Sequence, residues 1–365
     1  MSGQALPAAR APGRAVSRRA ALLVPAAAAI AAASWRSSGA ASAAAGFVYT
    51  ADEGANAISR IDLKGARVES VRVPVTPHNV QFVPGRKRLL AVGMPVAGGA
   101  GGAHTQHQGG HGAASGAGQL VVLDTAAITS RPVATIATGR HPAHVIADAD
   151  GRRAFVTNSE DDTLSVIDLD RARAIATVAT GRYPHGLRMS PDGRSIAIAN
   201  VEDASVSLIG TGSLAEEARI RVGRAPVQVG FIPDGSRLYV SLRDENAVAV
   251  IATATREVVG RIGVGRGPIQ VYATPDGRFV YVANQGSEAE PDETVSVIDV
   301  AAGTLAGTIR AGRGTHGVVV STDGAFAFVT NTLAGTVSEI SVGSQAVVKS
   351  FRVGRGPNGI TYQPG

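Results

Sequence analysis

Histidine is the residue of this 365-residue chain whose placement points most directly to chemistry. Five of the eight histidines occur near the start of a repeated segment: His78, His141, His144, His185 and His316. His78 and His185 directly follow a proline, and His316 occupies the same place after Thr315. Neutral imidazole is a common ligand of Cu(II), Zn(II) and Ni(II). If the fold brings these segments together, the pattern predicts a transition-metal site at His78, His144, His185 and His316.

The remaining three histidines lie in a glycine-rich insertion at residues 98–118, and they are His104, His107 and His111. A His-rich tract next to a group of histidines favours metal capture by both together. The alternative is that the repeated histidines line a hydrated channel and that the insertion is a disordered loop. Both interpretations stay open at this point.

A second candidate group consists of arginines in a recurring Gly-Arg dipeptide. These are Arg140, Arg182, Arg224, Arg266, Arg313 and Arg355, at intervals of 42, 42, 42, 47 and 42 residues. One interpretation is that each guanidinium makes paired hydrogen bonds to a nearby carboxylate or carbonyl and so stabilises its repeat. The other is that some arginines, together with Asn358, bind a small anionic ligand.

The elements that position these residues follow from the repeat itself. A fixed period near forty residues indicates an array of one supersecondary unit. The unit that begins at Gly139 predicts strands over 141–147, 154–157, 163–168 and 174–180, with Asp150-Gly151 as a two-residue hairpin turn. Four short strands per repeat are typical of one blade of a β-propeller. The fold class is therefore all-β.

The two ends of the chain predict how the ring closes. The last repeat supplies one strand, and residues 47–50, 58–62 and 68–73 supply the other three, with Phe47-Val48-Tyr49-Thr50 matched to Phe155-Val156-Thr157. Pairing the C-terminal strand with N-terminal strands gives seven four-stranded blades and removes free edges. In such a ring, the Gly-Arg turns, the starts of the innermost strands and the loops after the second strands share one face. Acidic loops such as Asp52-Glu53 and Glu160-Asp161-Asp162 fall on that face.

Several strands resemble a known repeat family. Phe155-Val156-Thr157-Asn158, Tyr281-Val282-Ala283-Asn284 and the Ser-Val-Ile-Asp segment at 165–168 are similar to YVTN-type β-propeller repeats. The resemblance covers residues 47–365 and implies an exported or surface protein. Its relatives include lactonases and the propeller domains of nitrite and nitrous-oxide reductases. It supplies no matching catalytic residue set, and the chain has fewer histidine ligands than the copper site that the nitrous-oxide reductase relatives carry.

The first 43 residues differ in composition from the rest. Four arginines, a run of about fourteen small or apolar residues and Ala41-Ser42-Ala43 predict a twin-arginine-like signal peptide cleaved near Ala43, with a run too short to span a membrane. Residues 1–43 hold five arginines and no acid, so the net charge falls from +6 to +1 without them. Nucleic-acid binding is therefore not expected. We expect a periplasmic or extracellular protein with no membrane span after cleavage.

These observations favour a function as a monomeric, non-enzymatic binding or scaffold protein over residues 44–365. The expected ligand is a divalent transition metal (Cu or Zn) or a small anion at the mouth of the channel, or a protein partner on the loop face. The absence of cysteine excludes thiol chemistry and disulfides. No metalloprotease, nucleophile-elbow or phosphate-loop motif occurs. Two alternatives remain, a lactonase-like hydrolase on the same scaffold and an interaction platform for a periplasmic redox system.

Overall fold

The structure is a computed structural model that describes residues 44–96 and 116–365. The predicted signal peptide and the predicted ligands His104, His107 and His111 lie outside the described residues. Among the described residues, no helix is long and apolar enough to cross a membrane.

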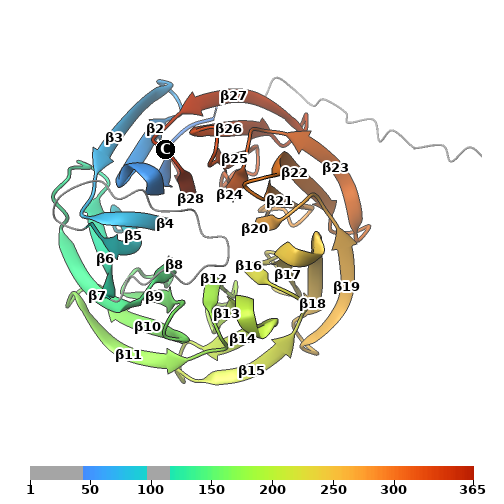
Figure 1. The fold of residues 1–365 in the computed structure, drawn as a ribbon, viewed down its shortest axis with the longest axis horizontal. Helices are drawn as coiled ribbons and strands as arrows, with labels where there is room; N and C mark the ends of the chain where they lie inside the picture. Colours follow the sequence, from blue (N-terminus) through green and yellow to red (C-terminus); the bar gives the residue numbers. More distant parts are fainter. Residues whose placement is uncertain (1–43, 97–115) are drawn as a thin grey trace, which may run out of the picture. The chain divides into compact units, whose positions relative to one another are not determined.

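Seven four-stranded antiparallel sheets form a closed ring (Figure 1), which confirms the predicted fold and blade number. Blade 1 comprises β4 (Val75–Val83), β5 (Arg88–Pro95), β6 (Ala117–Asp124) and β7 (Ala134–Arg140). Blade 2 comprises β8 (Pro142–Ala147), β9 (Arg153–Asn158), β10 (Thr163–Asp168) and β11 (Arg173–Ala179). Blade 3 comprises β12 (Pro184–Met189), β13 (Ser195–Asn200), β14 (Ser205–Gly210) and β15 (Glu216–Arg221). The first strand of each blade is the innermost (Figure 1).

The other four blades repeat this plan. Blade 4 comprises β16 (Pro226–Phe231), β17 (Arg237–Leu242), β18 (Ala247–Ala252) and β19 (Glu257–Gly263). Blade 5 comprises β20 (Pro268–Ala273), β21 (Phe279–Gly286), β22 (Pro291–Asp299) and β23 (Thr304–Arg310). Blade 6 comprises β24 (Thr315–Val320), β25 (Phe326–Asn331), β26 (Thr336–Ser341) and β27 (Ala346–Arg352). Blade 7 comprises β28 (Pro357–Gln363), β1 (Phe47–Asp52), β2 (Ala57–Asp62) and β3 (Arg67–Arg72). Short 3-10 turns follow three second strands, at η1 (Glu53–Ala55), η2 (Val201–Asp203) and η3 (Arg243–Glu245).

Blade 7 closes the ring as predicted, because β1 pairs antiparallel with β28, with Phe47 opposite Gln363. The register of the N-terminal strand differs from the prediction. Asp52 pairs with Pro357 just as Asn158 pairs with Pro142, so Tyr49, rather than Phe47, is the equivalent of Phe155. The matching of residues 47–50 to residues 155–157 was therefore wrong by two positions. The hydrophobic pattern left this register open, since residues 47 and 49 are both aromatic.

The core lies between neighbouring blades and depends on large side chains at one repeated position. Tyr49, Phe155, Tyr239, Tyr281 and Phe328 are fully buried in second strands. Alternating strand residues fill both faces of each sheet, since each blade packs against two neighbours. A buried aromatic side chain removes about 150–250 Å² from water, so these positions stabilise the stacking of blades.

The Asp-Gly turns exist, but their predicted type was wrong. In blade 2 the N–H of Asp148 donates to the Arg153 carbonyl, and the N–H of Gly151 donates to the Asp148 carbonyl. Four residues therefore separate the closing pair, and within this connection only Gly151 has a positive φ, +66°. A type I turn followed by a left-handed glycine needs no positive φ at the aspartate.

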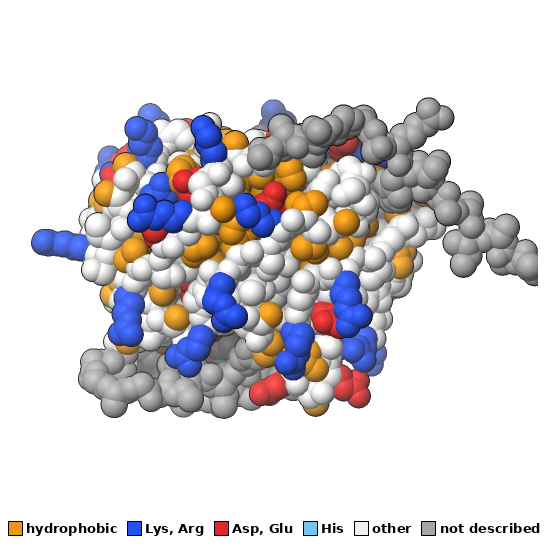
Figure 2. All heavy atoms as spheres, turned by 90° about the horizontal axis from the view of Figure 1, so that it is seen from above, with side chains coloured by type: hydrophobic (Ala, Val, Ile, Leu, Met, Phe, Trp, Pro, Cys, Tyr) orange, Lys and Arg blue, Asp and Glu red, His pale blue; other side chains and the backbone are white. Residues whose placement is uncertain are grey.

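The side of the propeller seen in Figure 2 carries dispersed charge rather than one basic patch. Figure 2 shows Lys and Arg side chains spread singly over one side, with apolar side chains between them. This distribution agrees with the small net charge expected once residues 1–43 are set aside.

Candidate functional site

The Gly-Arg turn is built around the asparagine that ends the second strand. In blade 2 the N–H of Gly139 donates to Asn158 Oδ1 at 3.0 Å. Asn158 Nδ2 donates to Thr163 Oγ1 at 3.0 Å and to Ser165 Oγ at 2.9 Å. A Cβ on Gly139 would lie 2.6 Å from Asn158 Cγ, so only glycine fits here. These hydrogen bonds link strands β7, β9 and β10, so the repeat motif has a structural role.

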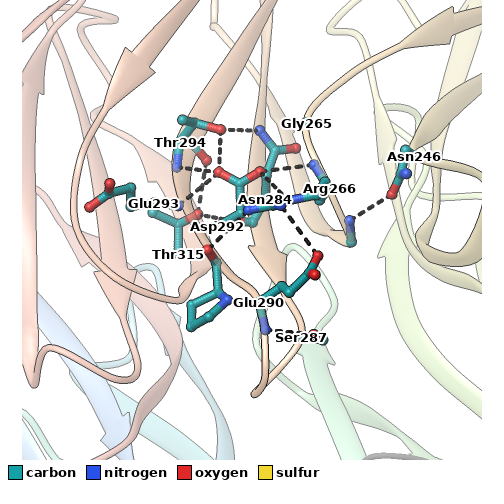
Figure 3. A network of polar contacts seen from close by, with 12 residues as sticks. Asn246, Gly265, Arg266, Asn284, Ser287, Glu290, Asp292, Glu293, Thr294 and Thr315 are labelled. Carbon is teal, nitrogen blue, oxygen red and sulfur yellow. Dashed lines mark hydrogen bonds and ion pairs between the residues drawn. The ribbon is translucent and has the colours of Figure 1, made fainter.

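Blade 5 repeats the contacts of the asparagine amide (Figure 3), but the N–H of Gly265 donates to Ser296 Oγ rather than to the asparagine. Asn284 Nδ2 donates to Thr294 Oγ1 and Ser296 Oγ, both at 3.0 Å. Asp292 Oδ2 accepts the main-chain N–H of Arg266 at 2.9 Å. The carboxylate therefore fixes the turn from the side of the loop.

Four of the arginines of these turns each contact the loop after the second strand of the blade that the turn precedes. The guanidinium groups of Arg140, Arg182, Arg224 and Arg266 donate to the main-chain carbonyls of Glu160, Glu202, Asp244 and Pro291. Arg140 also binds Asp161, with Nε to Oδ1 at 2.6 Å. Four of the six predicted anion ligands thus have the geometry of the bracing interpretation. Arg313 and Arg355 are exposed and make no side-chain hydrogen bond within the described residues.

The threonine of the repeat motif connects neighbouring blades. Thr157 Oγ1 in β9 donates to the His185 carbonyl in β12 at 2.6 Å and accepts the His144 N–H of β8 at 3.1 Å. Thr330 makes the same link from blade 6 to the Asn358 carbonyl in blade 7. Each such hydroxyl fixes the spacing of two innermost strands, and Thr157 does so for two strands that carry histidine.

Three of the predicted metal ligands come together on the innermost strands of neighbouring blades. His78 on β4, His144 on β8 and His185 on β12 each offer a ring nitrogen, and these atoms lie within 4.8 Å of one another. The Nε2 atoms of His78 and His185 are 3.2 Å apart. His144 lies between them in sequence, and its ring centroid is 4.8 Å from that of His185. Three consecutive blades therefore supply one cluster, called the histidine triad below.

Hydrogen bonds to the triad orient its rings. His185 Nδ1 is 3.2 Å from the Val227 carbonyl, so it donates its proton there and leaves Nε2 with a lone pair. His78 Nδ1 lies 3.2 Å from Asn358 Nδ2 and 3.6 Å from Glu53 Oε2. Asn358 Nδ2 in turn donates to Glu53 Oε2 at 2.8 Å. A carboxylate and a carbonyl behind imidazole rings are typical outer contacts of metal-bound histidines.

His144 is the most buried member and has an unused ring nitrogen. Its side chain is 1 % exposed, Nδ1 is 3.4 Å from Gln228 Nε2, and Nε2 has no hydrogen-bond partner among the described residues. A buried polar atom without a partner costs about 1–3 kcal/mol. A metal ion at this place would supply the missing partner.

Burial keeps two rings of the triad, His144 and His185, in the neutral form that binds metal. Burial lowers the pKa of His144 well below its usual range, and the nearby His185, His78 and Arg188 lower it further. Burial, followed by the neighbouring His78, also lowers the pKa of His185 well below its usual range. Metal ions bind the deprotonated imidazole, so the two rings are ready for coordination at neutral pH.

The sequence also matches a known family of propellers. A family model for YNCE-like β-propellers matches residues 90–363. The chain belongs to this family. A sequence comparison with curated proteins finds no match. The YNCE-like fold thus agrees with the resemblance to YVTN-type repeats.

Two solved structures share the propeller with this YNCE-like chain. Hydrazine synthase of Kuenenia stuttgartiensis is 19% identical, covers 80% of this chain and 96% of its own, and gives a TM-score of 0.65. A functionally unknown protein of Desulfotomaculum acetoxidans is 15% identical, covers 88% and 100% respectively, and gives a TM-score of 0.69. At these identities the likeness shows the fold alone.

The other predicted ligands of this YNCE-like propeller are placed differently. His316 on β24 is 6 % exposed, and burial followed by the charge of His78 lowers its pKa to about 3, yet its ring does not belong to the histidine triad. Asn358, predicted as an anion ligand, contacts His78 and Glu53 instead. Sequence reasoning placed Glu53 on the correct face without giving it a role, and it missed Gln228 and Thr157.

Proposed function

We propose that this propeller is an exported, non-enzymatic binding protein whose ligand is a transition metal ion, Cu or Zn. The ion would be held by the histidine triad. One observation carries the proposal, namely three imidazoles from three blades with ring nitrogens within 4.8 Å of one another. Export is supported by the predicted signal peptide alone.

The distances fit a metal ion of this size. Zinc binds imidazole nitrogen at about 2.0–2.1 Å, so tetrahedral ligand atoms lie about 3.4 Å apart. The 3.2 Å between the Nε2 atoms of His78 and His185 is close to that value. His144 needs a small adjustment to complete the set, since 4.8 Å is the largest separation in the cluster.

The proton balance also fits. With His185 Nδ1 donating to Val227, the contact between the two Nε2 atoms needs a proton on His78. A metal ion at this position would displace that proton from Nε2. Glu53 Oε2, 3.6 Å from His78 Nδ1, is placed to accept a proton carried on that side of the ring. Glu53 is therefore a positioning residue for the proposed site.

Calorimetric titration of the chain from residue 44 with Zn(II) and Cu(II) tests the proposal. The three histidines of the insertion are first replaced by alanine, so that binding reports the triad alone. We expect one ion per chain, and we expect His144→Ala to cost more than the 10–100-fold typical of losing an outer contact. No binding tighter than about 1 mM, or an affinity unchanged by His144→Ala, would overturn the proposal.

A hydrolase is a second candidate because the same geometry allows it. Three protein ligands leave a fourth position on zinc for water, which is the arrangement of catalytic zinc sites. Chelator-sensitive turnover of a panel of lactones, lost in His144→Ala, would favour this function. Metal binding without turnover would favour the binding protein.

A further inference from the structure

Blade 7 differs from blades 2 and 4 at the position where a carboxylate closes the Gly-Arg turn. Three residues after the end of the second strand stand Asp161 in blade 2, Asp203 in blade 3 and Glu245 in blade 4. In blade 7 the equivalent residue is Ala55, counted from Asp52. The acidic side chain is therefore missing from this turn.

The other blades show what that carboxylate does. A carboxylate accepts the main-chain N–H of the repeat arginine in three blades, at 2.7 Å from Asp161 to Arg140, 2.7 Å from Glu245 to Arg224 and 2.9 Å from Asp292 of β22 to Arg266. Asp203 of blade 3 binds Ser205 and Arg219 instead. In blade 2 the same carboxylate also binds the guanidinium, and in blade 4 it binds Arg261 of the outermost strand at 2.9 Å. Each of these carboxylates is an anion supplied by the chain itself, and it is bound by a main-chain N–H and an arginine side chain.

In blade 7 the arginine of this turn is Arg355, and the outermost strand adds Arg72 beside it. The main-chain N–H of Arg355 has no hydrogen-bond partner among the described residues, and neither Arg355 nor Arg72 forms an ion pair there. Both arginines are exposed. Together with Ala55, Ala57, Ser70 and Gly354 they line a pocket of about 330 Å³. The floor is fixed, because Ser70 contacts Ser59, which hydrogen-bonds the buried Asp52.

We propose that this pocket binds a small oxyanion, either a carboxylate or a phosphate, from outside the chain. The oxyanion would take the place of the carboxylate that other blades supply themselves. Its oxygens would accept the Arg355 N–H and the guanidinium groups of Arg355 and Arg72. Two arginines and a main-chain N–H give the charge-assisted hydrogen bonds that oxyanions form most strongly. The pocket shares no residue with the histidine triad, and the proposed anion needs no metal ion.

Blade 6 shows that the absence of an acidic side chain from the turn is not enough to form such a pocket. It carries Ala334 at the equivalent position, but an apolar side chain lies beside the turn. A Cβ on Gly314, next to Arg313, would be 2.9 Å from Leu333 Cγ. Blade 7 has Gly54 where blade 6 has Leu333, which leaves its turn open.

Titration with inorganic phosphate and, separately, with succinate tests the proposal, in buffer containing EDTA so that the triad holds no metal. Ala55→Asp is the decisive variant, because it restores the carboxylate that blades 2 and 4 tolerate. We expect one anion per chain, at least tenfold weaker binding in Ala55→Asp, and a similar loss in Arg72→Ala. Arg224→Ala is the matched control, since Glu245 already occupies that turn, and it should change the affinity less than twofold.

Titration with each anion distinguishes a phosphate ligand from a carboxylate ligand. Binding of phosphate alone assigns a phosphate ligand, and binding of succinate alone assigns a carboxylate ligand, provided that Ala55→Asp removes it. No binding of either anion at 10 mM, on the order of the weakest specific affinities, overturns the proposal. Equal binding by Ala55→Asp with an unchanged circular dichroism spectrum overturns it as well.

Discussion

Asp52 is the acidic counterpart of the asparagine that ends the second strand in other blades, and its replacement by asparagine should stabilise the protein. Its side chain is fully buried and accepts hydrogen bonds from Thr50 Oγ1, Ser59 Oγ and the Gly354 N–H. Burial raises its pKa to about 6 despite these three donors. The folded protein therefore holds a carboxylate where it would more readily hold a neutral group.

The size of the effect follows from the pKa. A folded pKa of about 6 compared with 3.8 in the unfolded chain corresponds to about 3 kcal/mol. Because the folded pKa is the higher of the two, this contribution to stability is fully present below pH 3.8. It is lost as the pH rises through about 6. An asparagine at position 52 has no such loss, and its amide can accept from Gly354 and donate to Thr50.

Urea unfolding followed by circular dichroism measures this difference, since the single tryptophan, Trp35, lies outside the described residues. At pH 7.5 we expect Asp52→Asn to raise the free energy of unfolding by about 1–3 kcal/mol, the upper end being the full electrostatic value. At pH 4 the gain should nearly vanish. Equal or lower stability of the variant at pH 7.5, or a gain that does not change with pH, would refute the reasoning.

Asn158→Asp in blade 2 is the matched reverse change. It places a carboxylate in the same network beside Gly139, Thr163 and Ser165. We expect it to lower stability at pH 7.5 by a similar amount and to have little effect near pH 4.

Two further changes test the packing of the repeat. Gly139→Ala should destabilise the protein by about 1–3 kcal/mol, because its Cβ would lie 2.6 Å from Asn158 Cγ. Gly307→Ala is the control and should be tolerated, since no atom lies within 4 Å of the added Cβ. Equal unfolding midpoints for the two variants would contradict this account. Thr157→Val should cost about 1–3 kcal/mol, since it leaves the His185 carbonyl and the His144 N–H without their shared hydroxyl. Unfolding in urea measures both, and an unchanged midpoint for Thr157→Val would show that the link between blades 2 and 3 is dispensable.

The architecture could be predicted from the sequence because the residues of the repeat pack against one another and therefore recur together. Glycine, asparagine and the hydroxyl residues of the third strand recur together, since each occupies space that another leaves free. Period and turn residues therefore led to seven blades and to closure by β28 and β1. The register of β1 could not be obtained in the same way, because Phe47 and Tyr49 fit the alternation equally well and asparagine is replaced by Asp52.

The candidate site was only partly accessible from sequence. Neighbouring innermost strands start on one face, so a common location for His78, His144 and His185 was foreseeable. Side-chain direction was not, because His78 and His144 occupy different places in their strands, although their ring nitrogens lie close together in the structure. For the same reason His316 could not be separated from the histidine triad. The pocket of blade 7 depends on the absence of an acid at Ala55, which becomes visible only beside the acidic turns of other blades.

Anomalous diffraction from crystals of the chain grown with Zn(II), collected at the zinc edge, tests the central claim most directly. One peak should lie between the ring nitrogens of His78, His144 and His185, at about 2.0–2.1 Å from each, and it should disappear in His144→Ala. A map without a peak at the histidine triad, or with zinc bound only elsewhere, would contradict the proposed metal site.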